Sequence, residues 1–240
     1  MARQVVKDYE AVAEFPSSEF KAVGDSASPK AMISHILPDN AGPVDVLDIG
    51  FGSGSLGAHI KANAATSHWS VDGIDGWAAN CENRALIDRR IYRHIWHGLA
   101  QDLSAEQIRR YKILCLLDVI EHLDVDTARR LLRSLLASMA DDAYLFISTP
   151  LWFYPQGQLQ PGDLEAHLIG VPATSMIVLM PYMYSVSRSL IGGFVLGKRS
   201  LDFVEYFHPT ADRGFTYEKG IAIIEAIGMQ RQPGVVYKLG

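Results

Sequence analysis

The first residues that can do chemistry lie in a ten-residue stretch, Asp48 to Gly57, where a carboxylate is followed by four glycines. The stretch closes a short apolar run, Val44–Ile49, whose composition predicts a strand. Glycine lets the backbone turn sharply out of a strand and approach a ligand closely. A helix that begins near Ser55 would then point its free N–H groups at that ligand. The pattern therefore predicts a strand, a turn and a helix that bind a nucleotide-like cofactor.

Two kinds of cofactor fit this turn. The spacing Gly52-x-Gly54-x-x-Gly57 also matches the fingerprint of dinucleotide-binding folds. Asp48 favours a different ligand, because it sits at the carboxyl end of a strand, where ligands bind in open α/β sheets. A diphosphate gains nothing from a carboxylate there, whereas a cofactor with an ammonium group does. The structural alternative is that Asp48 only caps the turn.

A second carboxylate follows the next expected strand. Asp75, in the sequence Gly73-Ile74-Asp75-Gly76-Trp77, is placed to accept hydrogen bonds from both hydroxyls of a ribose. Trp77 offers an apolar surface to an adenine ring. Asp75 capping the next helix is the alternative, and Asp72 is a competitor that falls inside the strand.

Two further motifs end the fourth and fifth expected strands. The first reads Leu-Asp-Val-Ile-Glu-His-Leu over Leu117–Leu123, and the second is Ser148-Thr149-Pro150. With the glycine-rich stretch and Asp75, they resemble the class I S-adenosylmethionine-dependent methyltransferases, within these the branch that carries VIEHL and STP. The match covers residues 44–150, with a weaker helix match over Phe215–Gly228.

The resemblance implies S-adenosylmethionine as cofactor, with the glycine-rich turn at its methionine end and Asp75 at its ribose. The turn His97–Leu103 would contact adenine. Leu99 stands there where many relatives have an acid, so backbone groups of Ala100, or Gln101, are expected to replace it. The cofactor-binding residues we predict are Asp48, Gly50, Phe51, Gly52, Ser53, Gly54, Asp75, Gly76, Trp77, Ala100, Gln101, Asp118 and Val119.

Three interpretations remain open for Asp118, Glu121 and His122. They shape the floor of the cofactor site, as the resemblance implies, or His122 is a general base, since imidazole titrates near neutrality. In the third, they bind a divalent cation with a further ligand such as His167, an arrangement similar to methyltransferases that act on RNA 3′ ends and on quinone precursors. We name His122 and His167 as catalytic candidates and assign no metal ligand.

Short apolar runs alternate with amphipathic stretches between residues 44 and 149, which is typical of β-α-β units. The clearest helix pattern is Thr127–Met139, with Asp126 or Thr127 as its cap. We predict an α/β, Rossmann-like, doubly wound sheet with helices on both faces and an insertion after strand five. The resemblance implies seven mainly parallel strands, the last antiparallel. The five expected strands are Val44–Ile49, Trp69–Ile74, Ile91–Trp96, Ile113–Leu117 and Ala143–Ser148.

The chain, 1–240, is predicted to be a single domain. Residues 1–40 form an N-terminal helical segment, 44–150 bind the cofactor, 151–200 cover the substrate, and 201–240 supply the C-terminal strands and helix. Within the last part we expect a helix over Thr216–Ile227 and a strand over Gly234–Leu239, while Leu201–Phe207 is a candidate sixth strand.

The insertion is rich in aromatic residues. Its stretch Met176–Gly197 is long enough to cross a bilayer, but Pro181, Arg188 and a glycine pair favour a helical hairpin or lid. A lipophilic acceptor or a membrane-surface contact is the alternative. The candidates for the acceptor pocket are Trp152, Phe153, Tyr154, His167, Tyr182 and Tyr184.

Composition narrows the function classes. A net charge of −5 argues against a nucleic-acid partner, because duplex binding needs a basic face. Two cysteines give no disulfide or zinc spacing, and with no apolar signal core we expect a cytoplasmic protein without a stable membrane span. We predict methyl transfer to an oxygen or nitrogen of a small-molecule or sugar-linked acceptor. The alternatives are an NAD(P)-dependent oxidoreductase and a non-catalytic S-adenosylmethionine-binding protein.

Overall fold

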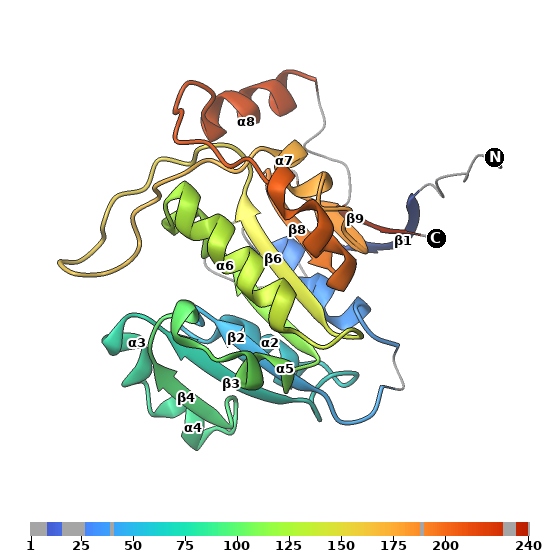
Figure 1. Ribbon diagram of the computed structural model, residues 1–240, viewed down its shortest axis with the longest axis vertical. Coiled ribbons are helices and arrows are strands. Elements are labelled where there is room, and N and C mark those ends of the chain that lie inside the picture. The colour runs from blue at the N-terminus through green and yellow to red at the C-terminus, as the bar shows by residue number, and fades with distance from the viewer. Residues whose placement is uncertain (1–8, 16–26, 39–40, 188–189, 228–233, 240) are drawn as a thin grey trace.

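The computed structural model describes residues 9–15, 27–38, 41–187, 190–227 and 234–239, which build an α/β fold around a single sheet (Figure 1). Its parallel part has the order β4-β3-β2-β5-β6. All five strands predicted between residues 44 and 149 are present, with ends shifted by up to three residues. They are β2 (Asp45–Ile49), β3 (Ser70–Asp75), β4 (His94–His97), β5 (Ile113–Leu117) and β6 (Tyr144–Pro150).

Four more strands extend the sheet beyond β6 in the order β8, β7, β9 and β1, and all their pairings are antiparallel. The described sheet therefore has nine strands where the resemblance implied seven. The predicted strand at the C-terminal end, Gly234–Leu239, is confirmed. The bounds are β1 (Tyr9–Phe15), β7 (Met183–Val186), β8 (Ile191–Leu196) and β9 (Gly234–Leu239).

The N-terminal helical prediction is wrong for Tyr9–Phe15, which is a strand paired with β9. The stretch is a strand because β9, far away in the sequence, pairs with it along its whole length. A helical stretch does follow, as α1 (Ala27–Lys30) and the 3₁₀ segment η1 (Ala31–His35). The parts of this prediction that fall on residues 1–8 and 16–26 lie outside the described residues.

The predicted helical hairpin over Met176–Gly197 is also wrong, because two parts of this stretch, Met183–Val186 and Ile191–Leu196, are strands of the sheet. After the short helix α7 (Ala173–Ile177) the chain forms the antiparallel pair β7 and β8. Every residue of β8 is buried, as expected for a strand packed on both faces between β6 and β7. The candidate strand Leu201–Phe207 is largely the 3₁₀ segment η4 (Lys198–Tyr206). In the described part of the chain, no helix has the length and apolarity to cross a membrane.

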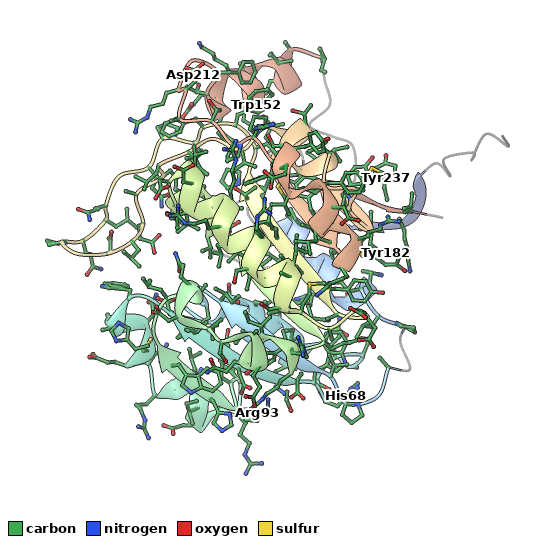
Figure 2. The ribbon with its side chains drawn as sticks, in the orientation of Figure 1. His68, Arg93, Trp152, Tyr182, Asp212 and Tyr237 are labelled. Atoms are coloured by element: carbon green, nitrogen blue, oxygen red, sulfur yellow. The ribbon has the colours of Figure 1, made fainter. Side chains whose placement is uncertain are left out.

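What remains as an excursion from the sheet is residues 151–172, which we call the cover segment. It runs as a long loop past the end of α6, at the left in Figure 1, and holds only isolated β-bridges. The expected C-terminal helix is present as α8 (Tyr217–Ala226). Figure 2 shows that Tyr182 and Tyr237 lie at the β7–β9 end of the molecule, whereas Arg93 lies at the β4 end.

Helices cover both faces of the sheet, which confirms the doubly wound prediction. Alternate strand residues point to opposite faces, so Val46 packs into one apolar cluster and Leu47 into the other. The first cluster includes residues of η1, α2 (Ser55–Ala62) and α4 (Ala85–Asp88). The second includes α5 (Ala105–Arg109), α6 (Val125–Ser138) and η4. Burial on both faces explains why the central strand β5 is wholly apolar, whereas β4, at the edge of the sheet, is largely exposed.

Helix α6 begins earlier than predicted. Its cap is Asp124, which accepts hydrogen bonds from the backbone N–H groups of Asp126 (3.0 Å) and Thr127 (2.9 Å). Val125 extends the apolar stripe at the start of the helix, and the 127–139 pattern had left it out. The prediction that Asp126 or Thr127 is the cap is therefore wrong.

Replacing Asp124 with alanine should lower the melting temperature by roughly 2–4 °C, the scale of a lost helix cap in a domain of this size. Asp126→Ala is the matched control, because its carboxylate receives none of the cap hydrogen bonds and should have a smaller effect. Thermal denaturation followed by circular dichroism measures both. Equal shifts in the two variants would contradict the cap assignment.

Candidate functional site

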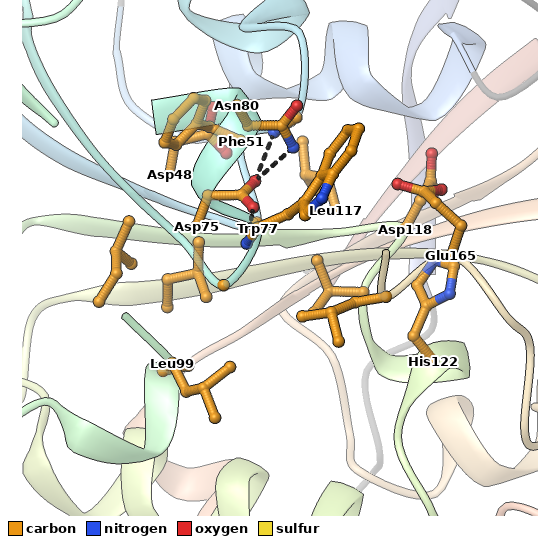
Figure 3. A pocket seen from close by; sticks show the side chains of 18 of the residues that line it. Asp48, Phe51, Asp75, Trp77, Asn80, Leu99, Leu117, Asp118, His122 and Glu165 are labelled. Carbon is orange, nitrogen blue, oxygen red and sulfur yellow. Dashed lines mark hydrogen bonds between the residues drawn. The ribbon is translucent and has the colours of Figure 1, made fainter. Parts of the chain in front are cut away.

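A cavity of about 760 Å³ opens at the carboxyl ends of β2, β3 and β5 (Figure 3). The strand order reverses between β2 and β5, so the cavity lies at the switch point where open α/β sheets bind ligands. All but two of the predicted site residues line it. Those that do are Asp48, Gly50, Phe51, Gly52, Ser53, Asp75, Gly76, Trp77, Ala100, Gln101, Asp118, Val119 and His122.

The glycine-rich turn leaves β2 in a left-handed conformation at three positions. Gly50, Gly52 and Gly54 have φ values of 70°, 54° and 82°, which residues with a Cβ seldom adopt. A Cβ on Gly50 would also lie 2.5 Å from Val119 Cγ2, so the turn can pack against the end of β5 only with glycine there. Gly54 precedes the first residue of α2 and packs toward Leu86 rather than lining the cavity.

Asp75 is held at the end of β3 by three hydrogen bonds. Oδ2 accepts from Gly52 N (2.9 Å) and Asn80 Nδ2 (3.2 Å), and Oδ1 accepts from Trp77 N (2.8 Å), as Figure 3 shows in part. A carboxylate offers about four acceptor sites, so about one remains for a ligand. Asp75 therefore has room for one ribose hydroxyl, and Asn80, which also lines the cavity, is placed to meet a second.

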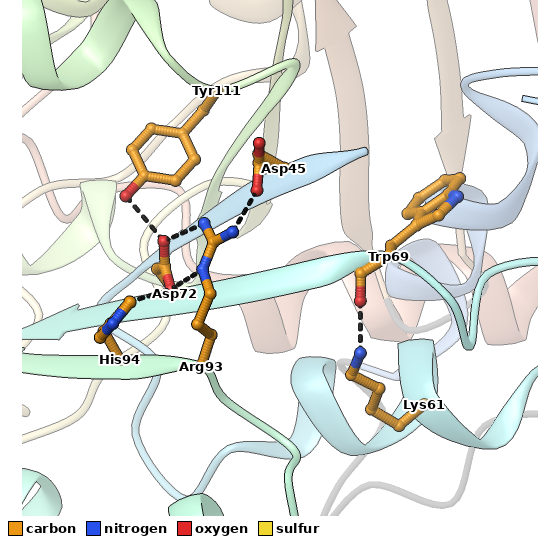
Figure 4. A network of polar contacts seen from close by, with 7 residues as sticks. All are labelled: Asp45, Lys61, Trp69, Asp72, Arg93, His94 and Tyr111. Atoms are coloured by element: carbon orange, nitrogen blue, oxygen red, sulfur yellow. Dashed lines mark hydrogen bonds and ion pairs between the residues drawn. The ribbon is translucent and has the colours of Figure 1, made fainter. Parts of the chain in front are cut away.

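Asp72, three residues earlier on the same strand, lies outside this cavity. Its carboxylate accepts from Arg93, Tyr111 and the ring of His94 in a network away from the glycine-rich turn (Figure 4). Arg93 also pairs with Asp45. The hydrogen bonds and the positive charge of Arg93 hold the pKa of Asp72 below its usual value despite burial. Asp72 thus stabilises the β3–β4 edge, which removes it as a competitor of Asp75.

Asp48 is 2% exposed and receives a hydrogen bond from the Tyr92 hydroxyl at 2.6 Å. Burial raises the pKa of Asp48 to about 6, partly offset by that hydrogen bond and by the charge of Lys30. Burial and Asp48 together hold the pKa of Tyr92 well above its usual value, so its hydroxyl remains a donor. Above pH 6 the cavity therefore contains a buried, ionised carboxylate beside the glycine-rich turn.

A buried lysine, Lys30, lies close enough to Asp48 to lower its pKa and forms an ion pair with Asp118. Lys30 Nζ is 2.7 Å from Asp118 Oδ2, with side-chain exposures of 10% and 23%, and both residues line the cavity. Helix α1 can bring Lys30 there because β8 has glycine at position 193, where a Cβ would lie 2.7 Å from Pro29 Cβ. Asp118 itself has a φ of 54° and accepts a hydrogen bond from Ser148 Oγ at 2.8 Å.

The Ser-Thr-Pro motif on β6 supports the motif that follows β5. Ser148 binds Asp118, and the next residue, Thr149, donates to Glu121 Oε2 at 3.0 Å. Glu121 belongs to the 3₁₀ segment η3 (Ile120–His122) and is 2% exposed. Burial and the neighbouring Asp118 raise the pKa of Glu121 well above its usual value. The two motifs are thus one unit, in which hydroxyls position two carboxylates.

The cover segment brings His167 to His122. The backbone N–H groups of Leu168 and Ile169 both donate to the carbonyl of Glu121, at 2.8 and 3.2 Å. The two imidazole rings then meet edge to face with centroids 4.6 Å apart. His122 lines the cavity, whereas His167 is 6% exposed and lies behind it. Burial lowers the pKa of His167 to about 4, so its imidazole is neutral at physiological pH.

The cover segment also forms part of the cavity wall. Gln158, residues 163–166 and Leu168 line it, and Leu164 and Leu99 approach each other over Gly76. The aromatic candidates lie elsewhere, since none of them lines the cavity. Trp152, for example, packs against Phe215 with ring centroids 4.5 Å apart.

Sequence reasoning missed Lys30, Tyr92 and Asn80. Asn80 falls five residues after Asp75, so a search for polar residues in the first turn after β3 would have found it. Lys30 and Tyr92 carry no local signal, because their roles arise from contacts 88 and 44 residues away in sequence.

The strand order and the cavity at its switch point define a doubly wound, Rossmann-like α/β protein. A family model for a methyltransferase domain matches residues 25–179, which is more than half of the chain. The chain therefore belongs to this methyltransferase family, and the resemblance to class I methyltransferases is confirmed.

Solved structures of methyltransferases share the fold at low sequence identity. An O-methyltransferase family protein from Burkholderia thailandensis is 14% identical with a TM-score of 0.50, over 71% of this chain and 55% of that one. The mitomycin 7-O-methyltransferase MmcR is 15% identical with a TM-score of 0.46, over 70% and 52%. The plantazolicin methyltransferase BpumL, solved with SAH, is 17% identical with a TM-score of 0.41, over 52% and 46%.

The chain thus spans about half the length of these solved structures. No curated protein matches it.

Proposed function

We propose that this protein transfers a methyl group from S-adenosylmethionine to an oxygen or nitrogen atom of a small-molecule acceptor. The observation that carries the proposal is the pair of buried carboxylates, Asp48 and Asp75, on one cavity at the switch point of a methyltransferase-family fold. Asp48 suits the ammonium group of the methionine end, and Asp75 with Asn80 suits the ribose. The apolar faces of Trp77 and Leu99 suit the adenine.

A dinucleotide fits the same residues less well. The diphosphate of NAD(H) would lie beside the glycine-rich turn, where it would face the Asp48 carboxylate. Two like charges in a buried site repel strongly, because the local dielectric constant is low. Because of this repulsion, and because the chain belongs to a methyltransferase family, we favour the methyltransferase over the oxidoreductase.

The chain's own residues would align the reactants and exclude water. The sulfonium group of the bound cofactor supplies the electrophilic methyl, so the enzyme mainly brings an acceptor atom into line with it. An acceptor hydroxyl must lose its proton during transfer, and His122 stands in the cavity wall where it can accept one. Leu164 and Leu168 of the cover segment would shield the reaction from solvent.

The acceptor chemistry follows from the part of the cavity lining that we do not assign to the cofactor. Leu123, Leu131 and Leu168 make it apolar, while His122 and Glu165 add polar groups that can hold a hydroxyl or an amine. We therefore propose a partly apolar small molecule, a sugar-linked one included.

Conversion of the cofactor tests the catalytic part of the proposal. Full-length protein is incubated with methyl-labelled S-adenosylmethionine and a panel of phenols, hydroxylated sugar conjugates and amines, and products are identified by mass spectrometry. We expect labelled product and S-adenosylhomocysteine with at least one acceptor class. Tight cofactor binding without transfer to any of them would favour the non-catalytic binding protein instead.

Cofactor binding should depend on pH through Asp48. An ammonium group pairs with the ionised carboxylate, so affinity for S-adenosylhomocysteine should be roughly tenfold weaker at pH 5 than at pH 7.5, given a pKa of about 6. Because burial raises the pKa of Asp48 from its usual value of 3.8 to about 6, the ligand-free protein should lose stability as the pH rises between these two values. Calorimetry at several pH values measures this step, the change in affinity for S-adenosylhomocysteine between pH 5 and pH 7.5. The step should disappear in Asp48→Asn, and its persistence there would assign it to another group.

A further inference from the structure

Three side chains at and beside the wall of the cavity place possible metal-ligand atoms close to one another. Glu121, His122 and His167 each place one oxygen or nitrogen atom so that the three lie within 4.8 Å of one another. Glu121 Oε2 is bonded by Thr149, but Oε1 is buried and has no hydrogen-bond partner. A buried carboxylate oxygen without a partner is costly and calls for an explanation.

The two imidazoles cannot supply the missing donor in their neutral forms. His122 Nδ1 is 3.3 Å from the carbonyl of Ala166, and His167 Nδ1 is 2.7 Å from the carbonyl of Tyr154. A carbonyl only accepts, so each Nδ1 must carry the proton, and each Nε2 is left with a lone pair. Backbone carbonyls that fix the tautomer in this way are the usual outer partners of metal-ligating histidines.

Asp118 is excluded from the same set. Its two oxygens are already engaged by Lys30 and Ser148, so the ammonium of Lys30 compensates its charge. What remains is the Glu121 carboxyl group and two imidazoles, held together by the Thr149 hydroxyl and by the backbone hydrogen bonds from Leu168 and Ile169 to Glu121.

We propose that Glu121, His122 and His167 bind a divalent transition-metal ion whose open positions face the acceptor side of the cavity. A cation can occupy the space between these three ligand atoms and supply the partner that Glu121 Oε1 lacks. A set with two imidazoles selects Mn²⁺, Fe²⁺, Co²⁺, Ni²⁺ or Zn²⁺ over Mg²⁺ and Ca²⁺. His122 lines the cavity, so the ion would lie at its wall rather than in the sealed core.

The ion would deepen the proposed function, on which this part of the inference rests. Bound to an acceptor hydroxyl, it would lower the pKa of that hydroxyl, and the proton would leave to solvent before the oxygen takes the methyl group. With the ion present, His122 is a ligand rather than the base, and the acceptor class narrows to oxygen nucleophiles that can coordinate a metal.

Metal binding can be tested without any acceptor. The full chain, stripped with a chelator, is titrated with Co²⁺ and separately with Zn²⁺ and Mg²⁺, by visible absorption for Co²⁺ and by calorimetry for all three. We expect one Co²⁺ or Zn²⁺ per chain with weaker Mg²⁺ binding. Removing a ligand in His167→Ala or Glu121→Gln should weaken Co²⁺ binding at least about tenfold. His68→Ala, on the exposed surface, is the matched control and should leave binding unchanged.

Circular dichroism and affinity for S-adenosylhomocysteine are measured on every variant. Unchanged cofactor affinity in His167→Ala together with lost Co²⁺ binding would support the metal site. A failure of the metal proposal can be distinguished from a failure of the proposed cofactor binding, because the cofactor is titrated into metal-free protein. No Co²⁺ or Zn²⁺ binding by the wild-type chain would overturn the inference whatever the variants do. Equal binding by the wild-type chain and the Glu121 and His167 variants would overturn it as well.

Discussion

Replacing Asp75 with alanine is expected to weaken the binding of S-adenosylhomocysteine by roughly 1–3 kcal/mol, or about 5- to 150-fold. The carboxylate has about one acceptor site left for a ribose hydroxyl, and its other bonds hold Gly52 and Trp77 at the cavity. The variant therefore loses a ligand contact and the backbone geometry around it. Isothermal calorimetry of the full chain measures the change.

The control for this experiment lies on the same strand. Asp72→Ala removes a carboxylate of similar burial that lines a different surface and bonds Arg93 and Tyr111. It should lower the stability of the protein and leave affinity for S-adenosylhomocysteine within about twofold. If Asp72→Ala weakened binding as much as Asp75→Ala, the loss would reflect the strand and not the proposed ribose contact.

Removing Lys30 is expected to have the second large effect, on stability. In Lys30→Met the Asp118 carboxylate loses its counter-charge in a site where it is only 23% exposed, which should lower the free energy of unfolding by roughly 1–3 kcal/mol. The value stays at the low end for a buried pair because water can reach Asp118 from the cavity. Urea denaturation monitored by circular dichroism provides the measurement.

A double-mutant cycle separates the ion pair from packing. Lys30→Met with Asp118→Asn should recover part of the lost stability, since the amide leaves no uncompensated charge. Lys112→Met is the surface control, because Lys112 makes an ion pair with Asp142 of nearly the same length in solvent and should change stability little. Additive effects in the Lys30 and Asp118 cycle would show that the two residues do not interact.

The core of the fold could be predicted from local patterns. The central strands β2, β5 and β6 are short runs of almost wholly buried residues, and the glycine-rich turn needs backbone conformations that few other residues adopt. Each of these patterns lies within a few neighbouring residues, so it can be recognised without knowledge of the tertiary contacts.

The errors arise where pairing partners are distant. Tyr9–Phe15 is a strand because β9 lies beside it, more than 200 residues later in the chain, and β8 is a strand because β6 and β7 flank it. The glycine pair Gly192-Gly193 within the apolar stretch Met176–Gly197 suggested a hairpin or lid. In the structure, these glycines instead let helix α1 and the Phe194 ring approach the sheet. Sequence periodicity contains no information about such neighbours.

In the candidate site, too, some residues could be predicted from local sequence and others depend on tertiary contacts. Asp48 and Asp75 follow their strands directly, and the order of motifs placed them at one edge of the sheet. The ion pair of Lys30, the Tyr92 hydrogen bond and the meeting of His122 with His167 depend on tertiary packing. The motif Ser148-Thr149-Pro150 was recognised from the sequence, but its physical role in positioning Asp118 and Glu121 required the structure.

The identity of the cofactor is tested most directly by calorimetric titration of the wild-type chain with S-adenosylhomocysteine, S-adenosylmethionine and NAD(H) under one set of conditions. We expect both sulfur nucleosides to bind at one site per chain, with affinity for NAD(H) at least about tenfold weaker because its diphosphate would face Asp48. Tight binding of NAD(H) with no heat from either sulfur nucleoside would contradict it.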